Sequence, residues 1–156
     1  MICPKRTEAR DRRRTAIHEA GHLAVAQHLG VPTKDARIWR RDAVEALIET
    51  TWGGNIAIGC YGAPIGVRRV VAVAGTIAEA VWTGEDEVDF DDPGAMSATD
   101  WKQAGVQPGD GDRLLEAAEV AFALLSGPLW PALVREARRL ILEARHAATP
   151  EYAEAA

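Results

Sequence analysis

The chain has 156 residues, of which 47% are hydrophobic and 26% are charged, and its formal net charge is −5. This length corresponds to one domain, and this composition excludes a mainly disordered, collagenous or disulfide-scaffold protein. The negative balance excludes a uniformly basic surface, so we expect no nucleic-acid partner.

The cysteines and the apolar segments bear on the cellular compartment. Only Cys3 and Cys60 are present, so we expect no disulfide framework and a reducing compartment. The charged N-terminus is not followed by the apolar run of a secretory signal. The most apolar stretch, residues 70–82, is shorter than the ~20 residues that a membrane span requires. We therefore expect a cytoplasmic protein with no membrane partner.

The first part of the chain predicts a long helix followed by a small sheet. Residues 7–29 contain no Pro and a single Gly, and apolar residues recur there at helical spacing. Gly30 and Pro32 are expected to end this helix. Alternating side chains within residues 36–59 predict three short antiparallel strands, with a turn at Gly53-Gly54.

The middle of the chain predicts two helices separated by an acidic loop. Residues 67–81 are typical of a buried helix, which Gly84 is expected to end. Residues 85–92 are rich in Asp and Glu and predict an exposed, solvated loop; binding of basic peptides or calcium is the alternative. Ser97 is expected to start a short helix that Gly105 ends.

Two further helices are expected near the C-terminus, over residues 114–125 and 133–145, and residues 150–156 predict a flexible tail. Residues 1–149 then form a single domain. The predicted fold class is α+β and mainly helical, with a small antiparallel sheet and a C-terminal helical bundle.

The strongest chemical signal is the pentad His18-Glu19-Ala20-Gly21-His22, an H-E-x-x-H motif inside the first predicted helix. Four residues along a helix separate the two imidazoles by about 6 Å and about 40°, so both can reach one zinc ion. Glu19 then lies where it can take a proton from metal-bound water. The alternative is a pair of partly exposed histidines beside a solvated Glu.

A catalytic zinc site usually has three protein ligands, and three residues are candidates for the third. His28 has the metzincin spacing, but in a continuous helix it lies about 15 Å from His18 along the axis and on another face, where it would interact with the helix dipole. Glu79 is a ligand, a residue that supports a ligand, or an ordinary polar position. Asp100 also fits a helix-capping role with Ser97.

Three blocks of the sequence, in this order, resemble the zinc peptidase domain of FtsH-type AAA proteases. Residues 15–26 look like the H-E-A-G-H-A helix of that family. Residues 74–79 look like its G-G-x-x-A-E helix, and residues 97–100 look like its S-x-N-D segment. The resemblance implies a zincin-like active-site helix, with His18, His22 and Asp100 as zinc ligands. It also implies Glu19 as the general base and Glu79 as a supporting residue.

The chain departs from the family pattern in ways that concern delivery of the substrate more than zinc chemistry. Thr99 stands where the family has Asn, Ala74 replaces the first Gly of the second block, and Gly105 and Pro108 interrupt the last helix. No ATPase module or membrane anchor is recognisable. We therefore expect a stand-alone peptidase, served by a separate ATPase or assembled as a homo-oligomer.

The function expected from the sequence is that of a zinc-dependent metalloendopeptidase acting on flexible or unfolded protein. The alternative is a non-proteolytic zinc-binding interaction module that keeps the peptidase fold. An extended substrate would pair with an edge strand, for which residues 55–59 are the candidate. Arg14 lies one turn from His18 and either meets a substrate carboxylate or belongs to an exposed, charged helix end. Cys60, Trp101 and Trp130 are expected in the core.

Overall fold

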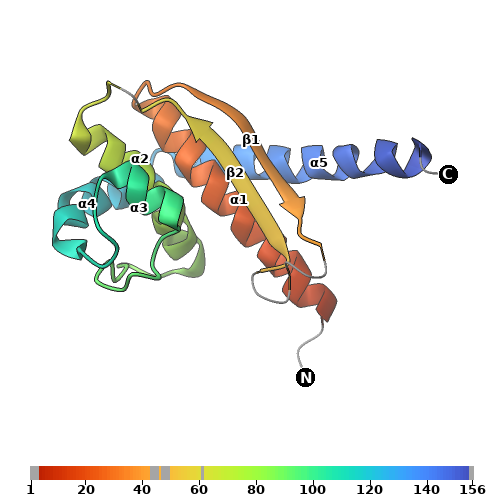
Figure 1. Cartoon of the computed structure of the whole chain (residues 1–156), viewed down its shortest axis with the longest axis horizontal. Helices are drawn as coiled ribbons and strands as arrows, with labels where there is room; N and C mark the ends of the chain where they lie inside the picture. Colours follow the sequence, from red (N-terminus) through yellow and green to blue (C-terminus); the bar gives the residue numbers. More distant parts are fainter. Residues whose placement is uncertain (1–3, 43–45, 47–49, 61, 155–156) are drawn as a thin grey trace.

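The computed structural model describes residues 4–42, 46, 50–60 and 62–154 (Figure 1). In this part of the chain the fold is mainly helical with one two-stranded antiparallel sheet, as the predicted α+β class requires. The elements follow in the order α1 (Pro4–His28), β1 (Thr33–Arg40), β2 (Trp52–Ile58), α2 (Ile65–Thr83), α3 (Ala98–Ala104), η2 (Gly111–Leu114), α4 (Leu115–Leu125) and α5 (Trp130–Glu154).

Helix α1 is the axis of the fold and packs against α2, α5 and both strands. It ends as predicted, because Gly30 has a φ of 72° and its N–H donates to the Gln27 carbonyl. Gly21 lets α2 approach very closely: a Cβ at this position would lie 2.6 Å from Ala78 Cβ and 2.7 Å from the Ala74 carbonyl oxygen. The backbones of the two helices are therefore almost in contact.

The predicted ends of α2 and α3 and the predicted start of α3 are confirmed by their caps, whereas α2 begins at Ile65, two residues before its predicted start. Gly84 ends α2 with a φ of 80°, and Gly105 ends α3 with a φ of 66°. Both values lie in the left-handed region, where glycine is favoured. Ser97 caps α3, because its hydroxyl accepts a hydrogen bond from the Asp100 N–H. The acidic loop between these helices is largely exposed, as expected.

The sheet differs from its prediction in two ways. The described residues contain two strands and not three; most of the alternating segment at residues 44–50 lies outside them. Gly53 and Gly54 do not form the predicted turn but pair with Trp39 and Ile38 inside the sheet. The prediction was wrong because two adjacent glycines also suit a strand that another chain segment approaches closely.

The C-terminal helices cover α1 and α2. Helix α4 packs mainly on α2 and α5 mainly on α1, and α5 crosses behind α1 in Figure 1. Residues 150–154, which belong to the predicted flexible tail, have a helical backbone at the end of α5. Among the described residues no single helix could span a membrane; one bent pair, residues 111–125 with 130–147, meets the length and composition criteria alone.

The core fills the space between these helices. Cys60 and Trp101 are buried, as predicted, and Trp130 packs against the core while remaining partly exposed. Three polar residues are buried with these apolar side chains: Glu19, His22 and Asp100. Burying such groups is costly unless they are paired. All three side chains line the same cleft.

Candidate metal centre

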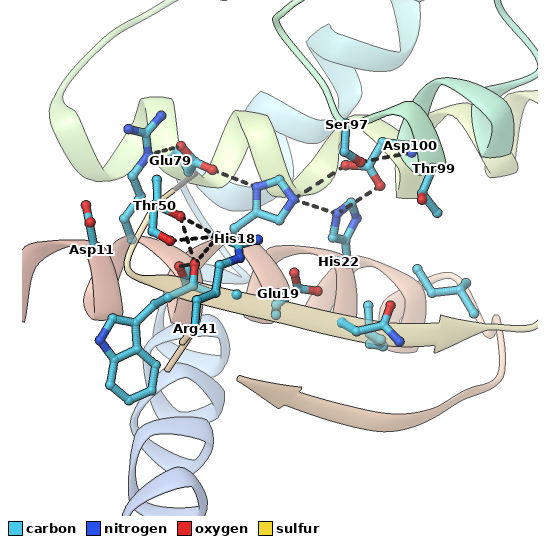
Figure 2. Close-up of a pocket in the computed structure, with 18 of the residues that line it drawn as sticks. Asp11, His18, Glu19, His22, Arg41, Thr50, Glu79, Ser97, Thr99 and Asp100 are labelled. Atoms are coloured by element: carbon cyan, nitrogen blue, oxygen red, sulfur yellow. Dashed lines mark hydrogen bonds and ion pairs between the residues drawn. The ribbon is translucent and has the colours of Figure 1, made fainter. Parts of the chain in front are cut away.

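His18 and His22 project from one face of α1 toward α2 and α3 (Figure 2). Their spacing of one helical turn brings the two Nε2 atoms to 3.1 Å from each other. Both residues line a cleft of about 410 Å³ between α1, β2 and α3. The sequence motif therefore produces the local geometry that it predicts.

Asp100 reaches the same point from α3, a helix that follows α1 by some seventy residues. Its carboxylate lies 3.5 Å from His18 Nε2 through one oxygen and 3.5 Å from His22 Nε2 through the other. The Ser97 cap fixes the first turn of α3 and thereby the direction of this side chain. His18, His22 and Asp100 thus form the one group of described residues with the donor spacing of a metal site.

The outer nitrogen of each histidine is held by a hydrogen-bond acceptor. His22 Nδ1 donates to the Val71 carbonyl at 2.8 Å, and His18 Nδ1 donates to a Glu79 carboxylate oxygen at 2.7 Å. With a proton on each Nδ1, both Nε2 atoms face the cleft. A histidine that ligates a metal through Nε2 has this arrangement once Nε2 is deprotonated.

These three residues fit a zinc ion. In a tetrahedral site with bonds of about 2.0–2.1 Å, neighbouring ligand atoms lie about 3.3 Å apart. The two Nε2 atoms are 3.1 Å apart and each lies 3.5 Å from its nearer Asp100 oxygen, and one ligand atom from each residue lies within 4.8 Å of the others. Two facing nitrogen lone pairs repel unless a proton or a cation lies between them. Asp100 Oδ2 is also buried without a hydrogen-bond partner among the described residues.

Space for the group is created by Gly75 of α2. A Cβ at this position would lie 2.5 Å from both Nε2 atoms. Any larger residue would therefore displace the histidines from each other and from Asp100. The glycine removes side-chain volume at the point where the ligand atoms converge.

Without a metal, the charged groups of the site strongly shift the pKa values of His18 and Asp100. Burial favours the neutral form of His18, but the carboxylates of Asp100 and Glu79 outweigh it and raise the pKa of His18 to about 10. Burial opposes ionisation of Asp100, yet the two histidines lower the pKa of its carboxyl well below the usual range. In the metal-free protein a proton therefore takes the place of a cation.

Glu19 lies between the histidines on α1 and faces strand β2. It is 8% exposed, and burial raises the pKa of its carboxyl above the ordinary value. Gly54 lies directly against it: a Cβ there would be 2.6 Å from Glu19 Cγ and 2.9 Å from Oε1. A buried carboxylate with a raised pKa, beside a candidate metal site, is suited to exchange protons.

The other predicted site residues fall into two groups. Glu79 contacts His18 and is itself held by Arg14, whose Nε donates to its second oxygen. Arg14 is therefore paired inside the protein, although its side chain is 59% exposed. His28 is exposed in the last turn of α1 and lies outside the cluster.

Strand β2 forms the remaining wall of the cleft, where residues 53–56 and Ile58 line it. Among the described strands β2 pairs with β1 alone, so one of its edges is unpaired. The predicted edge at residues 55–59 thus overlaps the second half of β2. At the other end of the strand, Arg41 Nη1 donates to the carbonyls of Thr50 and Trp52, which fixes that end of the wall.

Sequence reasoning missed three contributors to the site. The role of Gly75 was not recognised, although the G-x-x-x-E spacing with Glu79 places both on one face of α2. Gly54 was assigned to a turn. The Val71 carbonyl has no sequence signal, because every residue carries one.

No family model matches this chain, and no curated protein matches its sequence. The case for a function therefore rests on the geometry of the site.

Proposed function

We propose that this protein is a zinc-dependent metalloendopeptidase that cleaves flexible or unfolded protein, with a zincin-like fold akin to the peptidase domain of FtsH-type proteases. One observation carries the proposal: two histidines and a carboxylate converge at ligand distance, with a buried Glu and an unpaired strand edge in the same cleft. Structural zinc sites are closed by four protein ligands, whereas a three-ligand set leaves a position open for chemistry.

In this proposal His18, His22 and Asp100 hold the metal. Bound zinc would supply Lewis-acid chemistry, polarising the scissile carbonyl and making water acidic. Glu79 and the Val71 carbonyl orient the histidines through their Nδ1 protons.

Glu19 is the proton carrier. It takes a proton from the attacking water and returns it to the leaving amine, so that it ends the cycle unchanged. Its raised pKa suits both steps, because a carboxyl with a pKa nearer neutrality accepts and gives up a proton more evenly.

The substrate is expected to lie along the free edge of β2. Main-chain hydrogen bonds to that edge hold an extended peptide without regard to its sequence. Only unfolded or flexible segments can adopt this conformation, which supports the proposed substrate class. Whether a separate ATPase or a homo-oligomer presents such segments is a further part of the proposal.

The deciding experiment measures cleavage of an unstructured polypeptide, such as casein, by wild type and by Glu19→Gln. We expect wild-type cleavage that a chelator stops and zinc restores, and no cleavage by the variant at unchanged zinc content. Cleavage by Glu19→Gln at the wild-type rate would refute the proposed role. Zinc binding without any wild-type cleavage would instead favour a non-proteolytic zinc-binding interaction module.

Metal content tests the ligand set independently of activity. We expect about one zinc per chain in wild type and a loss of zinc in Asp100→Ala. His28→Ala is the matched control, because His28 is exposed and outside the cluster. Loss of zinc in His28→Ala with retention in Asp100→Ala would contradict the assignment.

A further inference from the structure

A second pocket, of about 360 Å³, continues the metal cleft beyond the end of β2. The two share Ile56, Ile58, Thr99 and Gln103 in their walls. Figure 2 shows Thr99 beside Asp100 on α3, on the side toward which β2 runs. A peptide lying along β2 therefore passes from the metal site directly into this second pocket.

The second pocket is basic. Arg68, from the first turn of α2, and Lys102, from α3, both line it, and none of its described lining residues is acidic. Neither side chain forms an ion pair with the described residues, and Arg68 is half-buried. A partly desolvated cation without a counter-charge gains from binding an anion.

The floor of this basic pocket is apolar and fixed. Ile56 and Ile58 supply aliphatic surface, and the buried Cys60 also lines the pocket. The Gln103 side-chain amide donates to Cys60 Sγ at 3.2 Å, which holds the wall between the two pockets in place. Such a surface accepts the methylene groups of a side chain while the two cations hold its charged end.

The basic pocket contrasts with the metal cleft, whose lining holds two arginines, Arg14 and Arg41, but four carboxylates, those of Asp11, Glu19, Glu79 and Asp100. The excess of carboxylates there disfavours a negative group of the substrate, whereas Arg68 and Lys102 favour one in the basic pocket. Charge complementarity therefore raises the affinity for a substrate and also determines where along the bound peptide a negative group is accepted.

We propose that the basic pocket is a specificity subsite that binds a substrate carboxylate, either of an Asp or Glu side chain or of the chain terminus. The inference rests on the proposed peptidase function. Ile56 and Ile58 lie two and four residues beyond Gly54, which touches Glu19. With a strand rise of about 3.3 Å per residue, the carboxylate lies about two to four residues from the bond that is cut.

The test is equilibrium binding, which needs no catalysis. Fluorescein-labelled decapeptides carrying one Glu or one Gln, each with a free or an amidated C-terminus, are titrated by anisotropy against zinc-loaded Glu19→Gln protein. We expect a carboxylate to tighten binding on the order of tenfold. The advantage should disappear in Arg68→Gln/Lys102→Gln on the same background. A failure to cleave casein would refute the peptidase and leave this measurement unaffected.

The matched control is Arg135→Gln/Arg138→Gln, which removes the same charge from the exposed face of α5 and should keep the tenfold advantage. Arg68→Glu/Lys102→Glu should reverse the preference toward a peptide with Lys, a gain that misfolding cannot produce. An advantage confined to the free C-terminus identifies the chain end as the ligand, and one confined to Glu identifies the side chain. Equal binding of all peptides, or an advantage that survives in Arg68→Gln/Lys102→Gln, overturns the proposal.

Discussion

The two sides of the metal cleft are built on different principles. On the helical side, α1, α2 and α3 hold His18, His22 and Asp100 by buried and partly buried hydrogen bonds and by close backbone contact. On the strand side, β2 offers an unpaired edge and partly exposed isoleucines. Beyond the end of the strand lie two cations from the helices, Arg68 of α2 and Lys102 of α3. In the proposed peptidase, the chemistry would therefore depend on the packed helical frame, whereas recognition of the substrate would depend on a more open surface that can change without disturbing that frame.

The largest expected effect, on zinc content and on stability, comes from adding a side chain on the helical side of the cleft. Gly75→Ala places a Cβ 2.5 Å from both histidine Nε2 atoms. We expect loss of zinc and destabilisation by about 1–3 kcal/mol, as is usual for overpacking. Zinc content and urea unfolding measure the two effects. The control in the same helix is Gly66→Ala, where a Cβ meets nothing within 4 Å and stability should be unchanged or rise by up to about 1 kcal/mol.

A Cβ added on the strand side, at Gly54, should lower kcat without changing zinc content. Gly54→Ala pushes against Glu19 Cγ, which moves the proton carrier and leaves the histidines in place. We expect kcat to fall by about a hundredfold, as for a misplacement of about 1 Å, while zinc content stays at the wild-type level. Gly59→Ala, whose Cβ would be 3.5 Å from Pro32, should keep wild-type kcat. Equal kcat in both variants would show that the Gly54–Glu19 contact does not position the carboxylate.

The hydrogen bond behind His18 provides a milder test of the helical frame. Glu79→Ala should weaken zinc affinity by about 10–100-fold, since it frees the ring that Glu79 orients. Glu79→Gln keeps an acceptor oxygen and should restore part of the loss, which a merely structural role would not predict. Arg14→Gln, which removes an exposed partner of Glu79, should weaken zinc affinity less than either substitution of Glu79. Competition with a chromogenic chelator gives the affinities.

The last test uses the pH dependence of the stability of the metal-free protein. The raised pKa of His18 means that its pairing stabilises the fold fully below its ordinary 6.5 and is lost as pH rises through about 10. The lowered pKa of Asp100 means that its pairing is present above its ordinary 3.8 and is lost as pH falls below that value. The stability difference between wild type and Asp100→Asn should therefore be largest between about pH 4 and pH 6.5.

Chelator-treated samples unfolded in urea across this range test the prediction. Asp86→Asn, in the exposed acidic loop, is the control and should show no such window. A difference between wild type and Asp100→Asn that grows steadily up to pH 10 would contradict the pairing of Asp100 with His18.

The same contrast explains what the sequence could predict. His18 and His22 are four residues apart in one helix, so helical geometry alone brings them together. The Ser97 cap, and the glycines that end α2 and α3, act within one turn of chain and were predictable for the same reason. The placement of Asp100 depended on a resemblance, because no local rule relates α3 to α1.

The strand side was predicted less well. Gly54 lies where it does because Glu19, from another element, occupies the space of its side chain. A turn and a close approach both favour glycine, and only the tertiary structure distinguishes them. The basic pocket could not be predicted either. Arg68 and Lys102 come from separate elements, and in the sequence each looks like an ordinary surface cation.

The near-contact of α1 and α2 at Gly21 has a consequence for how the protein opens. Ala16, Ala20, Val71, Ala74 and Ala78 have no exposed surface around this crossing. Amides in such a contact exchange their hydrogens with solvent only through large-scale unfolding. The proposed metal ligands of α1 thus lie in a part of the described structure that we expect to exchange slowly, and local fluctuations can reshape the proposed peptide-binding edge while the ligand geometry persists.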